Sequence, residues 1–318
     1  MPMVDALIEI FKLIFSVSFI LTVITASTPL LLAASGELVV ERSGVLNLGI
    51  EGMMIMGAAC GFAGAYMSGS TLIGALCGIL AGAALSAVFA ILTLGLAVNQ
   101  VAAGLALTIL GVGLSGLIGA GFVGVQIVQA PRLYLPILTD LPVIGRILFG
   151  EDAFVYFSIA LIIAMWLFLY RTRPGLVLRA VGDNHTSAHA LGYPVLRIRM
   201  LAVLFGGACA GLGGAFLSLA YTPFFIPGMT AGRGWIALAL VVFASWRPGR
   251  LVAGAYLFGA VSILGLALQP LQLGVPQQLM NSSPYLATVI VLVLISRTRG
   301  SAGSAAPASL GLVFVPDR

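Results

Sequence analysis

Apolar runs long enough to cross a bilayer follow one another along almost the whole chain, with only short stretches containing Gly, Pro and Arg between them. A helix crosses the hydrocarbon core of a membrane with about 20 apolar residues. Only 8% of the residues are charged and 60% are hydrophobic, whereas about a quarter of the residues in a soluble domain are charged. Most of the surface must therefore face the lipid bilayer, and the sequence predicts an all-α polytopic membrane protein.

The apolar runs predict about nine transmembrane helices, at residues 8–34, 46–67, 72–96, 101–121, 154–170, 200–221, 235–246, 251–268 and 284–296. A re-entrant or broken helix near residues 38–52 would raise this count to about ten. Glycines four residues apart, such as Gly207 and Gly211, indicate closely packed helices. Residues 1–299 are therefore expected to form a single transmembrane domain, followed by a flexible cytoplasmic tail at residues 300–318.

Basic residues concentrate on one side of the predicted bundle. Cytoplasmic loops retain Lys and Arg, and the loop of residues 171–199 contains five arginines. The opposite side keeps Lys12, Arg132, Arg146 and Arg233. This asymmetry predicts a multi-pass protein of the bacterial cytoplasmic (inner) membrane, with its C-terminus in the cytoplasm and its N-terminus outside.

The longest external loop covers residues 122–152 and contains three prolines together with Asp140, Glu151 and Asp152. Two interpretations of this loop are open. It either caps the external mouth of the protein or meets a soluble partner, or it is a plain connector between two helices.

Several kinds of chemistry are excluded by the residue content. Lys12 is the only lysine, so the chain has no G-x-x-x-x-G-K-[ST] phosphate loop and does not bind ATP in the P-loop way. If transport is ATP-driven, another subunit hydrolyses the ATP. The G-x-G-x-x-G match at residues 111–116 lies in an apolar run without a preceding strand, which indicates helix packing rather than dinucleotide binding. His185 and His189 are four residues apart, but no Glu follows His185 as in a zinc-protease helix and no Cys is near, so a solvated cytoplasmic face is predicted rather than a metal site. The net charge is +5, but in a membrane protein the position of the charges matters more than their sum, and no nucleic-acid partner is predicted.

Four motifs occur in order along the chain. The first is E-R-S-G-V-L-N-L-G-I-E-G-M-M at residues 41–54, and the second is N-Q-V at residues 99–101, followed by G-L-A-L-T at residues 104–108. The third is R-A-V-G-D-N at residues 179–184, and the fourth is G-R-G-W-I-A-L-A at residues 232–239, which leads to W-R-P at residues 246–248. From about residue 27 to residue 268, the chain resembles the permease subunits of ATP-binding-cassette (ABC) importers for branched-chain amino acids and simple sugars, in particular the nucleoside-type branch.

This resemblance implies three protein partners. A second permease chain, identical or paralogous, would complete the enclosure of the substrate path. A cytoplasmic ABC ATPase would bind ATP and Mg²⁺ and supply the energy, and an extracytoplasmic binding protein would deliver the substrate to the outer mouth.

The arginine-rich cytoplasmic loop has the local features of a coupling element. Pro174 and Pro194 bracket its polar centre, and Asp183 or Asn184 is placed to cap a short helix over residues 187–191. In the family that the chain resembles, such a helix docks into the ATPase. The resemblance therefore implies coupling contacts at Arg179, Gly182, Asp183, Asn184, Ala188, Leu191 and Gly192. The alternative interpretation is a solvated loop without a partner.

Glu51 is an ionisable residue in a costly position. If a helix begins near Val45, its carboxylate lies about 9–12 Å from Arg42 toward the bilayer middle, at about 1.5 Å per residue. A charge at such a depth is expensive and indicates a functional role by default. We therefore expect Glu51, together with Asn47 one turn earlier, to line the translocation route. The competing interpretation is that Glu51 pairs with Arg42 or with a neighbouring helix and holds the fold.

Further candidates for the substrate pathway combine amide, hydroxyl and aromatic groups: Asn99, Gln100, Thr108, Phe225 and Trp235. Aromatic faces with a few amides suit a flat, uncharged heterocycle such as a nucleobase. Aromatic residues are equally typical of the membrane–water interface, so both interpretations remain open.

The function that follows is import of nucleosides or related purine compounds by alternating access, as one subunit of an ATP-driven importer. The nearest alternative is the same machine with a simple sugar, such as a pentose, as its cargo. A third interpretation is an ion-coupled secondary carrier, which usually has several ionisable or broken-helix sites at the midplane, whereas Glu51 is the one strong candidate here. A passive channel has no support from a charged ring or a carbonyl filter motif.

Overall fold

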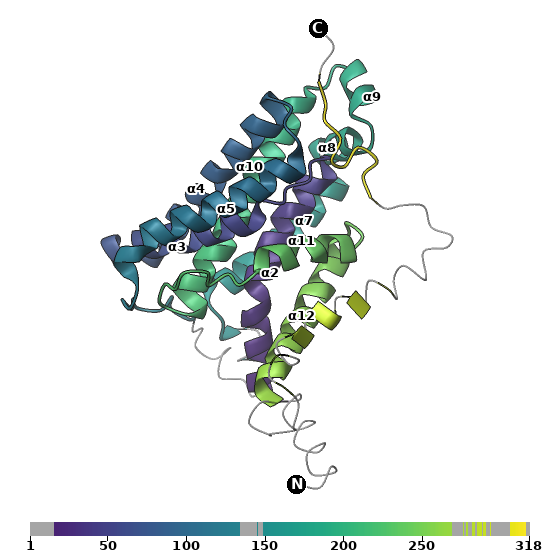
Figure 1. The fold of residues 1–318 in the computed structure, drawn as a ribbon. Helices are drawn as coiled ribbons and strands as arrows, with labels where there is room; N and C mark the ends of the chain where they lie inside the picture. Colours follow the sequence, from purple (N-terminus) through teal and green to yellow (C-terminus); the bar gives the residue numbers. More distant parts are fainter. Residues whose placement is uncertain are drawn as a thin grey trace.

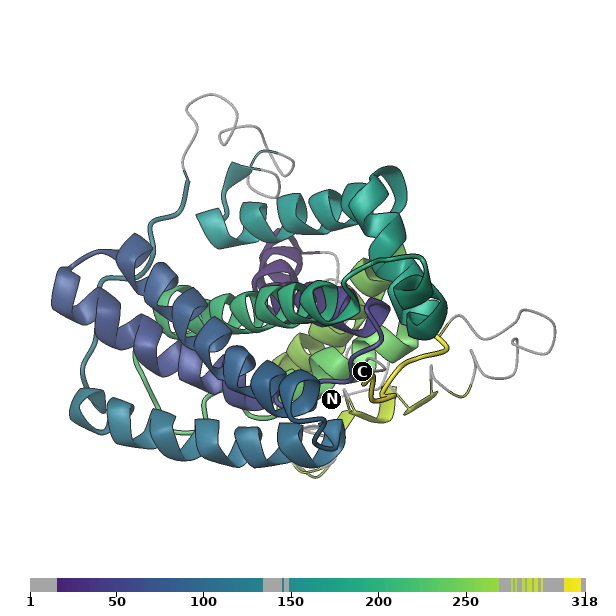
Figure 2. The same cartoon turned by 90° about the horizontal axis from the view of Figure 1, so that it is seen from above.

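A computed structural model of the protein describes residues 16–133, 149–268 and 306–315, together with residue 145 and scattered positions between residues 276 and 293. Seven helices in these residues are long and apolar enough to cross a membrane. They are α2 (Val17–Arg42), α3 (Ile50–Ser68), α4 (Thr71–Ala90), α5 (Gln100–Gly119), α7 (Ala153–Arg171), α10 (Val195–Phe216) and α12 (Pro248–Leu268). Shorter helices are α8 (Arg173–Asp183), α9 (His185–Ala190) and α11 (Arg233–Phe243). The regular elements of the described ranges are helical, as predicted (Figures 1 and 2).

The predicted count of nine transmembrane helices is not confirmed. The predicted span at residues 235–246 is α11, which has only 11 residues. At 1.5 Å per residue this helix is about 16 Å long, too short for a hydrocarbon core of about 30 Å. It ends just before Ser245 and Trp246, whose φ angles of 51° and 55° are incompatible with a continuing helix. The predicted span at residues 284–296 lies largely outside the described residues.

The first long helix also differs from its prediction. It runs to Arg42, although the apolar run predicts an end at residue 34. The polar side chains that interrupt the apolar run, including those of Glu37 and Glu41, are buried among neighbouring helices, so the backbone stays helical there. The break expected near residues 38–52 is the loop of residues 43–49, between α2 and α3. Residues 8–15 of the predicted first span are outside the described residues.

Helix α10 packs against α2, α3 and α4 and lies in the interior of the bundle (Figure 2). Helices α3 and α10 are the most enclosed of the seven long helices, whereas α5 and α7 leave much of their apolar surface outside. The approach of α3 to α10 requires glycine, because a Cβ on Gly57 would overlap the backbone of Gly211. Small residues at such contacts are how helices associate in lipid, and the close packing predicted from the glycine spacing is confirmed.

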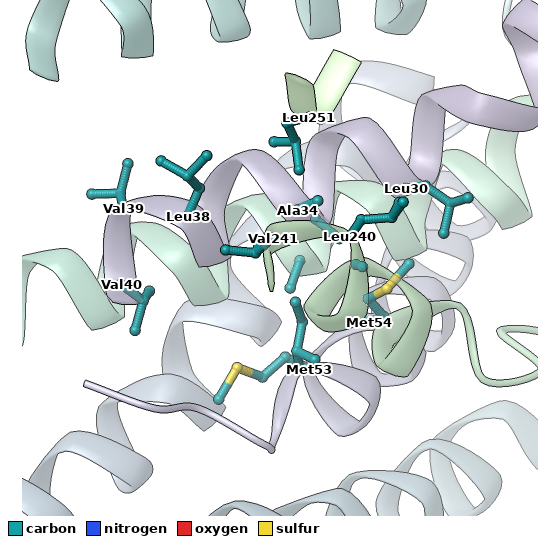
Figure 3. Close-up of a cluster of buried hydrophobic side chains, with 14 of the residues drawn as sticks. Leu30, Ala34, Leu38, Val39, Val40, Met53, Met54, Leu240, Val241 and Leu251 are labelled. Atoms are coloured by element: carbon teal, nitrogen blue, oxygen red, sulfur yellow. The ribbon is translucent and has the colours of Figure 1, made fainter. Parts of the chain in front are cut away.

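An apolar core joins α2, α3 and α11 (Figure 3). Its buried members include Leu30, Ala34 and Leu38 of α2, Met53 and Met54 of α3, Leu240 and Val241 of α11, and Leu251 of α12. The two methionines lie near the start of α3, two and three residues after Glu51. This core therefore holds α11 against the beginning of α3 and so positions the polar groups of the site.

Candidate functional site

The side chain of Glu51 is buried where the first turn of α3 meets the start of α11. Its Oε1 accepts hydrogen bonds from the hydroxyl of Thr230 at 2.6 Å and from the backbone N–H of Gly232 at 2.9 Å. Its Oε2 accepts a hydrogen bond from the backbone N–H of Gly234 at 2.6 Å. Glu51 therefore caps the N-terminus of a helix that is remote from it in the sequence.

The start of α11 needs an acceptor from elsewhere in the chain. The first N–H groups of a helix have no intrahelical partner, and the helix dipole makes this end attract a negative charge. The N-cap residue is Gly232, at φ 80°, which has no side chain to accept these hydrogen bonds. Gly234 also packs so closely that a Cβ there would lie 2.5 Å from the Cα of Glu51. The carboxylate of α3 and the first turn of α11 thus form a matched pair, here called the Glu51 junction.

The loop of residues 43–49 leads into this junction and is held from α5. The backbone N–H of Leu46 donates to Oε1 of Gln100 at 2.8 Å. The hydroxyl of Thr108 donates to the backbone carbonyl of Leu48 at 3.1 Å. Two predicted pathway residues therefore contact the loop backbone directly.

Asn47 is fully buried within the same loop. Its Oδ1 accepts a hydrogen bond from the backbone N–H of Gly49 at 2.9 Å, and its amide nitrogen donates to the sulfur of Met53 at 3.4 Å. Its backbone N–H donates to Oε1 of Glu37 on α2 at 3.3 Å. Asn47 therefore ties the loop to both of the helices that flank it.

Two buried carboxylates of α2, Glu37 and Glu41, are not among the predicted site residues. Oε2 of Glu41 accepts a hydrogen bond from Nε1 of Trp246 at 2.5 Å, and Arg42 donates to the backbone carbonyl of Trp246 at 2.8 Å. Oε2 of Glu37 and Oε1 of Glu41 have no hydrogen-bond partner in the part of the chain that the structure describes. The signal was available in the sequence, because two carboxylates four residues apart in an apolar run are as costly in lipid as Glu51.

The other pathway candidates occupy different surroundings. Asn99 is exposed, and its Oδ1 caps α5 by accepting a hydrogen bond from the backbone N–H of Ala102 at 3.0 Å. Phe225 is buried in a separate apolar cluster with Ile55, Ala59 and Phe62. Trp235 is half-buried on α11, next to Gly234. A role of these three residues in transport stays a prediction.

The predicted coupling region is a pair of short helices between α7 and α10. The hydroxyl of Thr172 accepts a hydrogen bond from the backbone N–H of Gly175 at 3.1 Å and so caps α8. Asn184 caps α9, because its Oδ1 accepts a hydrogen bond from the backbone N–H of Ser187 at 2.9 Å. The short helix expected over residues 187–191 is present at His185–Ala190, and Asn184 rather than Asp183 supplies the cap.

Three of the predicted coupling residues hold this helix pair in place. The guanidinium of Arg179 lies 5.0 Å from the ring centroid of Tyr170 on α7, an attractive geometry for a cation and an aromatic face. Gly182 packs on the end of α2, where a Cβ would overlap the backbone carbonyl oxygen of Arg42. Ala188 is buried and faces the inner side of α9. The α8–α9 pair is thus attached to α2 as well as to the helices that it connects.

Three other predicted coupling residues lie on the outer side of the pair. Asp183 is exposed, and the side chain of Leu191 is 78% exposed directly after α9. Gly192, at φ 87°, reverses the chain toward α10. Among the described residues, no group of three or more His, Cys, Asp and Glu side chains lies close enough together to hold a metal ion.

The described part of the 122–152 loop lies along the helical turn Leu217–Tyr221 that follows α10. The backbone N–H of Ala130 donates to the carbonyl of Leu219 at 3.0 Å. Glu151, just before α7, accepts a hydrogen bond from the hydroxyl of Thr25 at 3.3 Å. Burial, together with the neighbouring charge of Asp152, raises the pKa of Glu151 to about 7. Whether this loop caps the external mouth stays a prediction.

Residues 19–298 match the protein family described as the permease component of the branched-chain amino acid transport system. The chain belongs to this family. The matched residues include both the Glu51 junction and the α8–α9 pair, so both are parts of the permease.

Relatives of the permease with assigned names differ in their cargo. It is 43% identical to TsgC13 of Haloferax volcanii, a candidate glucose ABC transporter permease, over 87% of this chain and 91% of the relative. It is 32% identical to NupQ of Bacillus subtilis, a guanosine ABC transporter permease, over 86% and 92%. It is 31% identical to NupC of Lactococcus lactis, a nucleoside ABC transporter permease, over 84% and 89%. Second permeases with matching names, TsgB13 and NupP, exist in the first two organisms and are 25% and 23% identical to this chain.

Proposed function

We propose that this permease is the membrane subunit of an ATP-driven ABC importer. Relatives that align over about nine-tenths of their length carry the name of ABC transporter permeases. Because Lys12 is the only lysine, a phosphate loop of the usual type has to be on a separate ATPase. The observation that carries the proposal is the α8–α9 pair, which connects α7 to α10 and packs on the end of α2. A displacement of α9 by an ATPase would therefore reach three membrane helices.

The substrate we propose is a simple sugar, with a nucleoside as the second candidate. The relative named for glucose shares 43% of its residues with this chain, whereas the relatives named for guanosine and nucleosides share 31–32%. This order reverses the preference drawn from the motifs, which placed nucleosides first. Both classes present a hydroxylated ring, so one kind of polar pathway suits either.

For the Glu51 junction we propose a role in alternating access. The three hydrogen bonds of Glu51 use both of its oxygens on the start of α11 and the turn before it, which favours a clamp between α3 and α11 over direct contact with substrate. Irregular backbone precedes and follows α11, so this short helix is able to tilt as a unit, as discontinuous helices do in transporters. Asn47, Gln100 and Thr108 would fix the loop that enters the junction.

The proposed pathway runs beside this junction. Trp235 is the nearest of the remaining candidates in the chain, because it follows Gly234 on α11 and is half-buried. Phe225 would contact the substrate from the outer side, in the segment of residues 222–232 that leads to the Glu51 junction. Asn99 would contact the substrate from the start of α5.

The partners we propose follow from this assignment. The exposed face of α9 at Leu191 would dock the ATPase in the cytoplasm, and the external loop would receive the binding protein. A paralogous permease is the expected second membrane subunit, since TsgC13 and NupQ each have a second permease of matching name in the same organism. The C-terminus would then lie in the cytoplasm and the N-terminus outside.

Uptake measurements test the proposal. The permease is co-expressed with its second permease, ATPase and binding protein in cells without the native system, and entry of labelled glucose, ribose and guanosine is followed. We expect sugar uptake that stops on ATP depletion and persists when ionophores collapse the ion gradients. Uptake that survives ATP depletion but fails with the ionophores would identify a secondary carrier. Uptake of guanosine without sugar would reverse the substrate order.

A matched pair of variants tests the docking face. Leu191→Asp places a charge on a side chain that is 78% exposed, so it should leave the amount of folded permease unchanged. We expect it to abolish co-purification of the ATPase, whereas Leu191→Met retains it. Equal recovery of the ATPase with both variants would contradict docking at α9.

A further inference from the structure

Residues 306–315 belong to the stretch predicted as a flexible tail, yet they pack on the cytoplasmic helix pair. The backbone N–H of Ser309 donates to the carbonyl of Gly182 in α8 at 2.9 Å, and the backbone N–H of Gly311 donates to the carbonyl of Gly44 at 3.1 Å. The side chain of Ser309 is 4% exposed, and its hydroxyl donates to the carbonyl of Asp183 at 3.4 Å. Figure 1 shows this segment in yellow beside α8 and α9.

Phe314 anchors the segment on α9. Its ring packs edge-on against the rings of both His185 and His189, with centroid distances of 5.1 and 5.3 Å. It also contacts the buried cluster of Val181, Ala188 and Val195, which joins α8, α9 and α10. The four-residue spacing of the two histidines thus serves an aromatic contact in this structure.

Arg199 joins the segment to the other elements. It belongs to α10, its side chain is fully buried, and its guanidinium has three partners. Nε donates to the carbonyl of Ser43 at 3.1 Å, Nη1 donates to the carbonyl of Leu312 at 3.1 Å, and Nη2 lies 3.2 Å from Nδ1 of His185. A buried charge has to be hydrogen-bonded, and here its partners lie on the loop before α3, on the C-terminal segment and on α9.

These contacts place the C-terminal segment across the joint between the coupling helices and the loop that leads to Glu51. One backbone bond lies on the α8 side of the joint, at Gly182, and the other on the loop side, at Gly44. The loop continues from Gly44 to Asn47 and then to the first turn of α3. A movement of α9 would therefore be passed to this loop through the segment as well as through the direct contact of Gly182 with Arg42.

We propose that residues 306–315 take part in coupling together with the α8–α9 pair, and that Arg199 is the positioning residue that holds them between α9 and the 43–49 loop. This proposal rests on the proposed function of the α8–α9 pair. The segment transmits the displacement that the ATPase imposes on α9 to the start of α3, and hence to the Glu51 junction. Without it, ATP hydrolysis continues but moves less substrate.

The test uses the complete complex in proteoliposomes and measures substrate transported per ATP hydrolysed. Phe314→Ala removes the ring that contacts α9 and leaves the two backbone bonds possible, whereas deletion of residues 306–318 removes every contact. Val315→Ala is the matched control, because this side chain is 66% exposed. We expect Phe314→Ala and the deletion to lower the ratio by about twofold to thirtyfold, the range for changes along a coupling network, and Val315→Ala to leave it unchanged.

An unchanged ratio in both Phe314→Ala and the deletion overturns the proposal, and so does a proportional loss of ATP hydrolysis and transport, which a purely structural role would give. ATP-driven uptake by the wild-type complex tests the proposed function separately, before any variant is compared.

Hydrogen exchange supplies a second readout for any variant that assembles poorly in liposomes. In detergent-solubilised complex, ATP should change amide exchange in both α9 and the 43–49 loop of the wild type. In the deletion variant the change should remain in α9 and become smaller in the loop, where the direct contact of Gly182 with Arg42 is left. A loop response of undiminished size without the segment overturns the proposal.

Discussion

Replacement of Glu51 by alanine would leave three donors at the start of α11 without their acceptor. These donors are the hydroxyl of Thr230 and the backbone N–H groups of Gly232 and Gly234, at 2.6–2.9 Å from the carboxylate oxygens. A buried donor that loses its acceptor costs about 1–3 kcal/mol. Because three donors lose their acceptor together, we expect Glu51→Ala to lower the free energy of unfolding by at least about 3 kcal/mol.

Two smaller changes should give graded effects. Glu51→Gln keeps an acceptor for Thr230 and Gly232, but it sets an NH₂ group against the N–H of Gly234 and removes the charge at the helix N-terminus. Its expected cost is about 2–3 kcal/mol. Thr230→Val is similar in size and removes a single donor, so its expected cost is about 1 kcal/mol.

Thermal unfolding in detergent measures this order. A thiol-reactive dye reports it, because the free cysteines Cys60, Cys77 and Cys209 are buried or partly buried in the folded protein. The melting temperature should fall from wild type through Thr230→Val and Glu51→Gln to Glu51→Ala. Melting of Glu51→Ala at the wild-type temperature would refute the capping argument. Uptake per folded molecule of Glu51→Gln separates the two roles, since normal uptake excludes direct participation in translocation.

Gly211→Ala should lower the melting temperature, because its methyl group would overlap the backbone of Gly78. Gly113→Ala adds a methyl group in open space and should not lower it. Equal effects of the two variants would contradict the packing argument. The raised pKa of Glu151, about 7 against an ordinary 4.5, means that the folded protein holds a proton which the unfolded chain releases. Stability should therefore fall as pH rises from 4.5 to about 7. Glu151→Gln should flatten this part of the pH profile of thermal unfolding. An unchanged profile would show that titration of Glu151 does not cause the fall. Asn184→Ala removes the cap of α9, which contributes about 1 kcal/mol, and should reduce uptake per permease molecule. Asn184→Asp keeps a capping oxygen and should retain uptake. Similar uptake by both variants would show that the cap is not needed for transport.

Most long helices are predictable because apolar length is a local property of the chain. The run at residues 72–96 corresponds to the helical span Thr71–Gly95, and the run at residues 101–121 corresponds to Gln100–Phe122. The prediction fails where the depth of a segment in the membrane depends on the helices packed against it. Residues 235–246 are apolar enough for a span, but the chain enters this helix beside Glu51 and leaves it beside Glu41, so only a short helix fits between them.

Part of the site is also readable from residue types. A carboxylate in an apolar helix costs free energy wherever the chain folds, so Glu51 stands out without any structure, and the same argument applies to Glu37 and Glu41. The cap of α9 depends on residues three apart, and Asn184 is accordingly one of its two predicted candidates. The partners of Glu51 are 179 and more residues away in the sequence, and no local pattern connects them.

The sequence by itself determined that this protein is a helical membrane protein, because charge content and apolar length decide which solvent a chain can tolerate, and its four motifs indicated the permease family. Only the tertiary structure decided which hydrogen-bond partners its buried polar groups have. It places Glu51 on the start of α11 and Arg199 between α9, the 43–49 loop and the C-terminal segment. A buried polar group must find a partner, but which partner it finds depends on which helices meet, and that is set by packing between segments far apart in the chain.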